Sequence, residues 1–428
     1  MLFEDITILD ENFDIKKHKY VGIIDDRIDY IGNDKPVDIK RFGRKYAGKN
    51  RILVPGFYNI HAHSPMSIMR GYGENLELYK WLKEKIFPFE DNLKGHDIFF
   101  STLLSIAESL KFGIVSTTDM YFHINDMAKA YESTGAKVNL GRAVVKRGNN
   151  IDNNDTIKEM EASICEHHGK SEGKIMVDAS IHGEYTSDIE TVMRVNEIAK
   201  KENVGIHLHL SETDIETSEC IFRHKKTPTE YFNDLGVFDN RVTAAHSIWL
   251  TKKDINILQA KGVYVASCPT SNLKLSSGIC NIPELYAKGI SVGIGTDGSA
   301  SNNNLNFINE IKLFALLGKY KDSPKAMQPK DVIKSATRIG ALSQGRTDCG
   351  IIKEGYKADI VVIDSNTPNM YPVYDEVVNL IFSLSDANIE MTIIDGKVLY
   401  DKGEYNTIDV EKVYFEVEKS KSRILEKL

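Results

Sequence analysis

The chain has 428 residues, of which 42% are hydrophobic and 27% are charged, so its composition is that of an ordinary globular protein with about two or three domains. Its net charge of −7 supplies no basic field, and we therefore expect no nucleic-acid partner and no anionic membrane partner. No apolar stretch approaches the roughly 18 residues of a membrane span, and the first residues lack a signal-peptide pattern. With five widely spaced cysteines, these features predict a cytoplasmic protein with free thiols.

The two ends of the chain are rich in short strands separated by turn residues. Residues 1–54 contain too few apolar side chains for a core of their own, and similar strands recur at 357–364 and 391–398. We therefore predict that residues 1–54 and 346–408 together form one small composite β-sandwich domain. The amphipathic pattern of residues 409–428 predicts a C-terminal helix.

Between these ends, residues 55–345 alternate between strand-like runs and amphipathic helical segments. The strand-like runs are 57–61, 114–119, 137–142, 175–182, 204–210, 242–246, 263–267 and 292–297. The helical segments include 76–87, 98–112, 188–202, 251–261 and 304–319. This alternation predicts an α/β fold built on a (β/α)8 TIM-like barrel, with a doubly wound open sheet as the alternative.

The first strand-like run of this region ends in two histidines, His61 and His63. Residues at positions i and i+2 of a strand point to the same face, so both imidazoles can reach one cation. A His-x-His pair alone is a weak signal, because two solvated histidines near a turn give the same pattern.

Three later runs also end on side chains that bind metals or transfer protons: His209, His246 and Asp297. Only a closed barrel brings the ends of its first and last strands together, which is why we favour the barrel over the open sheet. We predict that His61, His63, His209 and Asp297 bind one divalent metal, with zinc the expected ion and iron the alternative. His207 lies one layer deeper, where we expect a packed core histidine.

A metal-activated water needs a base beside it, and Glu212 is placed to be that base. It follows His209 by three residues on the loop that leaves the strand, and the alternative is that it caps the next helix. His246 could hydrogen-bond the attacking oxygen, or be a packed histidine at a strand end. Asp297 could hold or shuttle the proton as well as bind the metal, so Glu212, His246 and Asp297 are the predicted catalytic residues.

Several stretches resemble a known family. They are Pro55-Gly56-Phe57-x-Asn59-x-His61-x-His63, Trp81-Leu82-x-x-Lys85-Ile86-x-Pro88-x-Glu90, His209-x-x-Glu212, Ser271-Asn272-Leu273-Lys274-Leu275 and Gly295-Thr296-Asp297-Gly298. On these residues the chain is similar to the amidohydrolase superfamily, and most closely to its S-adenosylhomocysteine/methylthioadenosine deaminases. The similarity spans nearly the whole chain.

The resemblance implies metal-dependent hydrolytic deamination of an adenine nucleoside, in which hydroxide formed at the metal adds to the purine C6 and ammonia leaves. Glu212 would carry a proton to N1. The same resemblance implies that Glu90 holds the ribose hydroxyls, that His182 contacts the purine edge and that Arg142 meets an anionic tail. Glu90 and Arg142 could instead be ordinary exposed charges. The expected partner is a small-molecule nucleoside or heterocycle, and we allow for a homo-oligomer.

The sequence departs from that pattern in the region expected to contact the substrate tail. Only Arg147 offers a second arginine after the third strand, and Glu184 follows His182, where an acid would repel a substrate carboxylate. Cys268 stands where a polar residue is expected and reads better as a small buried thiol. These departures weaken S-adenosylhomocysteine as substrate and leave methylthioadenosine, 5′-deoxyadenosine or adenosine. A related hydrolase acting on guanine, a triazine or a cyclic amide remains an alternative, as does an inactive scaffold.

Overall fold

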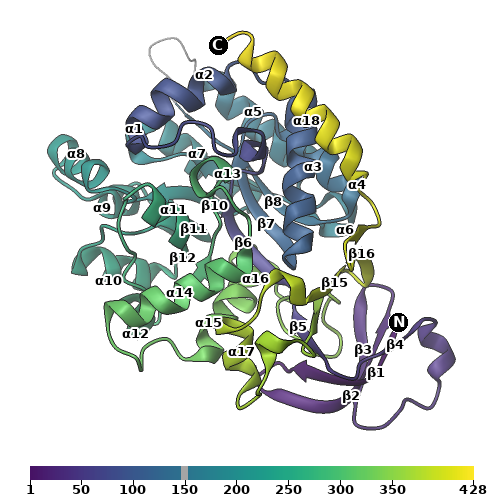
Figure 1. The fold of residues 1–428 in the computed structure, drawn as a ribbon. Coiled ribbons are helices and arrows are strands. Elements are labelled where there is room, and N and C mark those ends of the chain that lie inside the picture. The colour runs from purple at the N-terminus through teal and green to yellow at the C-terminus, as the bar shows by residue number, and fades with distance from the viewer. Residues whose placement is uncertain (146–152) are drawn as a thin grey trace.

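A barrel of eight parallel strands forms the centre of the computed structural model, which describes residues 1–145 and 153–428 (Figure 1). The strands are β6 (Phe57–Ala62), β7 (Ile114–Tyr121), β8 (Lys137–Arg142), β9 (Ile175–Ile181), β10 (Ile206–Leu210), β11 (Val242–His246), β12 (Tyr264–Ser267) and β13 (Val292–Ile294). Neighbours in the chain are neighbours in the sheet throughout. This order confirms the predicted barrel and excludes the doubly wound sheet, whose strand order reverses at a switch point.

The first and last barrel strands meet through a few specific hydrogen bonds. The backbone N–H of Asp297, just beyond β13, donates to the carbonyl oxygen of His61 in β6 at 3.0 Å. The side chain of Asn59 accepts from the backbone N–H of Thr296 at 3.0 Å and donates to its hydroxyl at 2.7 Å. The seam therefore holds His61 and Asp297 side by side.

Helices cover the outer face of the barrel, as Figure 1 shows, so strands such as β6 and β7 are buried on both faces. The principal helices are α3 (Gly95–Lys111), α4 (Ile124–Thr134), α5 (Asn153–His167), α7 (Ile189–Glu202), α8 (Asp214–His224), α9 (Pro228–Asp234), α10 (Lys252–Lys261), α12 (Ile282–Ala287), α14 (Phe307–Lys321), α15 (Pro329–Ala336) and α16 (Arg338–Ser343). No helix in the described part of the chain is both long and apolar enough to span a bilayer.

The predicted helix 76–87 is present in a modified form. It consists of α1 (Leu78–Trp81), a π-helical turn at Leu82–Ile86 and α2 (Phe87–Glu90). The pattern of apolar residues could not reveal the wider turn, because a π turn adds only one residue to the helical repeat. Its effect is to shift the faces of the two halves relative to each other.

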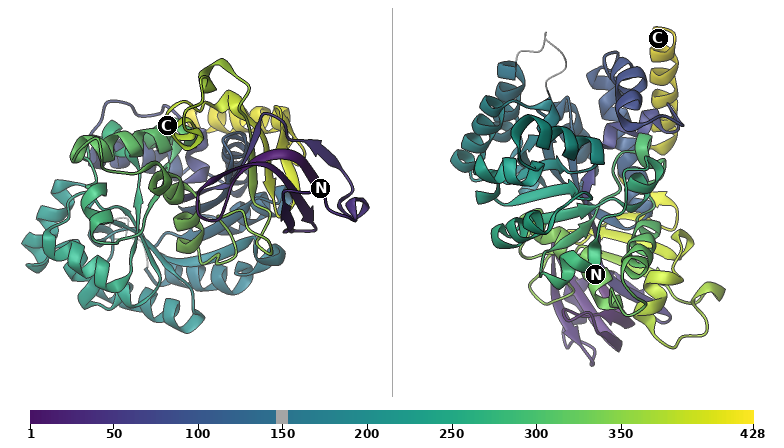
Figure 2. Two further views of the ribbon diagram at one scale, coloured as in Figure 1. Left: turned by 90° about the horizontal axis from the view of Figure 1, so that it is seen from below. Right: turned by 90° about the vertical axis from the view of Figure 1, so that its left-hand side faces the viewer.

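Strands from both ends of the chain share one mixed sheet, as predicted (Figure 2). Its strands are β1 (Leu2–Leu9), β2 (Ile15–Ile24), β3 (Arg27–Gly32), β4 (Lys45–Ala47), β5 (Arg51–Pro55), β14 (Ile360–Asp364), β15 (Ile389–Ile394), β16 (Lys397–Asp401) and β17 (Glu404–Tyr405). The two ends join where β14 runs antiparallel to β5, with Val361 opposite Val54. A separate apolar core that includes Phe3, Leu53 and Ile393 lies in this sheet. The last helix, α18 (Val410–Leu425), returns to the barrel and runs along α3, where Arg423 pairs with Asp97.

A buried cluster of charges fastens this sheet to the amino-terminal end of the barrel. Lys137, the first residue of β8, donates to both carboxylate oxygens of Asp359 at 2.7 and 2.6 Å and to Asp395 at 2.6 Å. Tyr58 donates to Asp359 at 2.6 Å. Burial alone would lower the pKa of Lys137, but the carboxylates outweigh it and raise that pKa, while Lys137 lowers the pKa of Asp359 against the effect of its burial.

We predict that Lys137→Met lowers the free energy of unfolding by about 3–5 kcal/mol, because it leaves Asp359 buried without its cation. Urea denaturation monitored by circular dichroism measures the change. The double variant K137M/D359N should recover part of the loss, and Lys129→Met, which removes an exposed lysine paired with Asp126, should change little. A K137M protein as stable as the parent would contradict the role given to this cluster.

Candidate metal centre and active site

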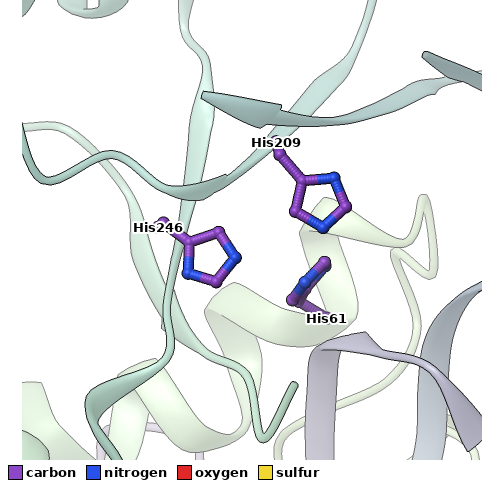
Figure 3. A group of neighbouring side chains, drawn as sticks. All are labelled: His61, His209 and His246. Atoms are coloured by element: carbon purple, nitrogen blue, oxygen red, sulfur yellow. The ribbon is translucent and has the colours of Figure 1, made fainter. Parts of the chain in front are cut away.

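Five side chains from four barrel segments converge at the carboxyl-terminal end of the strands. His61 belongs to β6 and His63 follows it, His209 and His246 belong to β10 and β11, and Asp297 lies three residues beyond β13. Figure 3 shows the imidazoles of His61, His209 and His246 pointing toward one another. The ring centre of His61 lies 4.8 Å from that of His209 and 5.2 Å from that of His246. The structure therefore brings the four predicted ligands together and adds His246 to the cluster.

The hydrogen bonds of the histidines leave their Nε2 atoms facing the centre. His63 Nδ1 donates to the carbonyl oxygen of Met120 at 2.6 Å, and His209 Nδ1 donates to that of His182 at 2.6 Å. Because a carbonyl can only accept, the proton of each neutral ring is on Nδ1 and the Nε2 lone pair is free to bind a metal. The Nε2 atom of His61 is buried with no hydrogen-bond partner among the described residues.

Asp297 is held so that one of its oxygens faces the histidines. Its Oδ2 accepts hydrogen bonds from Ser271 at 2.5 Å and from Ser301 at 2.7 Å. Its Oδ1 lies 3.4 Å from His61 Nε2 and 3.2 Å from His63 Nε2. Burial would raise the pKa of Asp297, but these two histidines hold it well below its ordinary value, so the carboxylate is ionised. Asp297 has a left-handed backbone with φ 60°, a strained conformation of the kind that collects at functional sites.

This donor set fits one divalent cation. Ligand atoms of His61, His63 and Asp297 all lie within 4.8 Å of one another, as do those of His61, His209 and His246. Burial lowers the pKa of His61 to about 3 and that of His209 well below its usual value, so both rings are neutral, as ligands must be. At His63 the effect of burial is outweighed by Asp297, which raises the pKa to about 9, so a cation competes there with a proton. Three imidazole nitrogens and a carboxylate oxygen are a ligand set typical of zinc.

Glu212 lies beside this cluster, on the loop between β10 and α8. It is 5% exposed, its Oε1 lies 3.4 Å from the hydroxyl of Ser277, and its Oε2 lies 3.8 Å from His246 Nε2. Burial raises its pKa. The cap of α8 is Thr213, whose hydroxyl accepts from the backbone of Glu216, so Glu212 is not the helix cap that the sequence left as an alternative. His246 is fixed by Asn272, to which its Nδ1 donates at 2.8 Å.

His63, His209, His246 and Glu212 line a cavity that also has an apolar wall. That wall includes Leu78, Trp81 and Leu82 from α1 and the π turn, and Phe87 from α2. Of the predicted substrate-binding residues, Glu90 and His182 line the cavity. The side chain of His182 is further fixed by Thr186, whose hydroxyl lies 3.1 Å from its Nδ1.

The arginines and the acid expected near the substrate tail are placed differently. Arg142 is not among the residues that line the cavity; its guanidinium contacts Glu159 at 2.8 Å and lies 5.2 Å from the ring centre of Phe122. Arg147 lies outside the described residues. Glu184 is buried and paired with Arg223 and with His224, so the repulsion of a substrate carboxylate that we expected from it does not arise.

Sequence reasoning missed several residues that shape the site. Ser271, Ser301 and Asn272 hold Asp297 and His246, and Tyr185 lines the cavity beside His182. Ser271 and Asn272 lie within one stretch that carries the family resemblance, and Ser301 follows another by three residues, which was the available signal. Cys268 is buried, as expected for a small thiol.

An eight-stranded barrel with histidines and an aspartate converging at its carboxyl end defines a class of metal-dependent hydrolases. The model of the amidohydrolase family matches residues 52–399, and the chain belongs to that family. It is 37% identical over 428 residues to a 5-methylthioadenosine/S-adenosylhomocysteine deaminase of Dictyoglomus thermophilum, covering 100% of this chain and 99% of the relative. It is 36% identical to a 5′-deoxyadenosine deaminase of Methanobrevibacter smithii, covering 98% and 97% of the two chains.

The crystal structure of an adenosine deaminase from Xanthomonas campestris with bound zinc superposes with a TM-score of 0.94 at 26% identity, covering 99% of this chain and 98% of that one. These relatives confirm the resemblance found in the sequence.

We predict that His61→Ala and Asp297→Ala each lower the metal content of the purified protein, because each removes a ligand that is buried in the cluster. Elemental analysis of metal per chain measures this. The control is His96→Ala, which removes an exposed histidine that contacts Glu416 on the surface. Full metal occupancy in both variants would refute the ligand set.

Proposed function

We propose that this protein is a zinc-dependent hydrolytic deaminase of an adenine nucleoside of the methylthioadenosine, 5′-deoxyadenosine, adenosine or S-adenosylhomocysteine type. The proposal rests above all on the convergence of His61, His63, His209 and Asp297 beside the buried acid Glu212. Relatives matched over almost their full length that are named as adenine-nucleoside deaminases support it. The zinc named with the Xanthomonas campestris structure supports the choice of metal.

The metal would be held by His61, His63, His209 and Asp297, and when bound it supplies Lewis acidity that lowers the pKa of water. The remaining chemistry belongs to the protein. Glu212 is the proton carrier: it accepts a proton from the attacking water and delivers it to N1 of the purine. Its raised pKa suits this role, because burial makes the carboxyl group accept a proton more readily than an exposed carboxylate does.

His246 and Asp297 orient the attack. Because Asn272 accepts from His246 Nδ1, the Nε2 of His246 faces the oxygen that adds to the ring. Asp297 is kept ionised by His61 and His63, so it can accept a hydrogen bond from the same oxygen. The serine hydroxyls on its Oδ2 keep its second oxygen away from the substrate.

The rest of the cavity is proposed to bind the nucleoside. His182 contacts the purine edge, Glu90 accepts from the ribose hydroxyls, and the apolar wall with Trp81 and Leu82 excludes water from the ring. Arg142 remains the proposed contact for an anionic tail, although such a tail would have to replace Glu159 as its partner.

Glu212 is held in place from behind by a second buried acid. Glu216 in α8 accepts the backbone N–H of Ser211 at 3.0 Å and that of Glu212 at 2.7 Å. Burial raises the pKa of Glu216 to about 7. These two bonds fix the backbone that carries the proton carrier, and Ser211 has a left-handed φ of 48° that needs such support.

We predict that Glu212→Gln retains its metal but loses activity by about 100-fold or more, since the amide cannot carry the proton. Ammonia release and the absorbance change from adenine to hypoxanthine nucleosides, measured over a panel of 5′-deoxyadenosine, methylthioadenosine, adenosine, S-adenosylhomocysteine and guanine, test the reaction and its substrate. Unchanged kcat in E212Q would remove Glu212 from the mechanism, and turnover of guanine alone would refute the nucleoside assignment.

We also predict that Glu216→Ala lowers kcat by about 10- to 100-fold at unchanged metal content, because a small displacement of Glu212 is enough to weaken proton transfer. The matched control is Glu219→Ala on the same helix, which removes an exposed acid paired with Arg223. If both variants have the same kcat as the parent, Glu216 does not position Glu212.

A further inference from the structure

His207 occupies the layer of the barrel directly beneath the metal centre. It belongs to β10, two residues before His209, and is 1% exposed. Its Nε2 lies 2.9 Å from Nδ1 of His61, with the two rings nearly perpendicular at 82°. None of the described residues forms a hydrogen bond with its other nitrogen, Nδ1, which is also buried. A histidine of this kind is costly, since a buried polar atom without a partner has lost its hydrogen bonds to water and gained none in the protein.

The contact with His61 differs from those of the other histidines in the cluster. His63 and His209 donate to backbone carbonyl oxygens, and His246 donates to an amide oxygen of Asn272. Each of those acceptors fixes the proton on Nδ1 by itself. The Nδ1 of His61 faces a nitrogen instead, and an imidazole nitrogen can either accept or donate.

The two rings can therefore be arranged in two ways. If His207 Nε2 accepts, His61 has its proton on Nδ1 and its Nε2 lone pair faces Asp297 and the other ligands. If His207 Nε2 donates, the proton of His61 is on Nε2, and that atom cannot bind a metal. Only the first arrangement makes His61 a ligand, and it places the proton of His207 on the nitrogen that has no partner.

We propose that His207 is a positioning residue for the metal centre: it accepts a hydrogen bond from His61 Nδ1 and thereby fixes both the ring plane and the protonated nitrogen of that ligand. The cost of the unpaired Nδ1 is offset by the fixed orientation of His61. Partners of this kind typically change metal affinity by about 10- to 100-fold when removed. The inference rests on the metal site of the proposed function, but it concerns affinity and not turnover.

The test compares zinc affinity, measured by competition with a chromogenic chelator, in the parent protein and in variants at this position. His207→Leu keeps the bulk but removes the acceptor, and we expect its zinc affinity to fall by about 10- to 100-fold. His207→Gln can place an amide oxygen near the position of Nε2, so it should restore most of the affinity. His207→Asn is too short to reach His61 and should resemble the leucine variant.

Ser180→Ala is the matched control. Ser180 is opposite His207 on the neighbouring strand β9, it is equally buried, and its hydroxyl also has no hydrogen-bond partner among the described residues. It should bind zinc as the parent does. The visible spectrum of the cobalt-substituted protein gives a second reading, because it reports the geometry of the ligands and should change in H207L but not in S180A.

Equal zinc affinity in folded H207L and parent proteins would overturn the proposal. If H207L does not fold, the comparison of H207Q with H207N decides, and equal affinities in these two would overturn it. If His61→Ala binds zinc as tightly as the parent protein, the metal site of the proposed function is refuted instead. The two failures are therefore distinguishable.

Discussion

The closing of the barrel between its first and last strands is the constraint on which the site depends. His61 takes part in it with its backbone, whose carbonyl oxygen accepts from Asp297, while its side chain faces the cluster. Asp297 likewise closes the seam with its N–H and faces His61 with its carboxylate. The fold and the metal site therefore share the same residues, and a change in how the strands meet would move two ligands at once. Asn59, which clasps Thr296, fixes the register of this junction.

Buried acids extend this organisation to the loops. Glu310 in α14 accepts from the backbone N–H of Thr270 at 3.2 Å and from the side chain of Asn302 at 2.9 Å, so it ties the short helix after β12 to the short helix after β13. Burial raises its pKa to about 7. The opposite end of the barrel has its own buried charges around Lys137, which connect it to the sheet formed by the chain ends. The catalytic cluster lies only at the carboxyl-terminal end of the strands, whereas the Lys137 cluster at the other end serves to connect the two parts of the structure.

The sequence predicts this fold well because the features that define it are local and periodic. Strand-like runs alternate with helical ones. His61, His209 and His246 lie near the carboxyl-terminal ends of their runs, and parallel strands in a barrel bring these ends together. What it does not predict depends on contacts between distant elements. Glu184 looked like an acid facing the substrate, but Arg223 from α8, 39 residues further along the chain, neutralises it. His207 looked like a core residue, and only the approach of β6 to β10 in space shows that it contacts His61.

Contacts between distant elements also explain why two carboxylates in one cavity have pKa values that shift in opposite directions. Asp297 and Glu212 are both buried, and burial favours the neutral form of each. Asp297 has two imidazoles against it and two hydroxyls behind it, which together stabilise its charge. For Glu212 the nearest imidazole, that of His246, is more distant, and the contact with Ser277 is weak. The effect of burial is therefore the larger one and raises the pKa of Glu212. One acid is thus kept ionised beside the cluster while the other can take up and release a proton, a division of roles that arises from the surroundings of the two groups and not from their residue type.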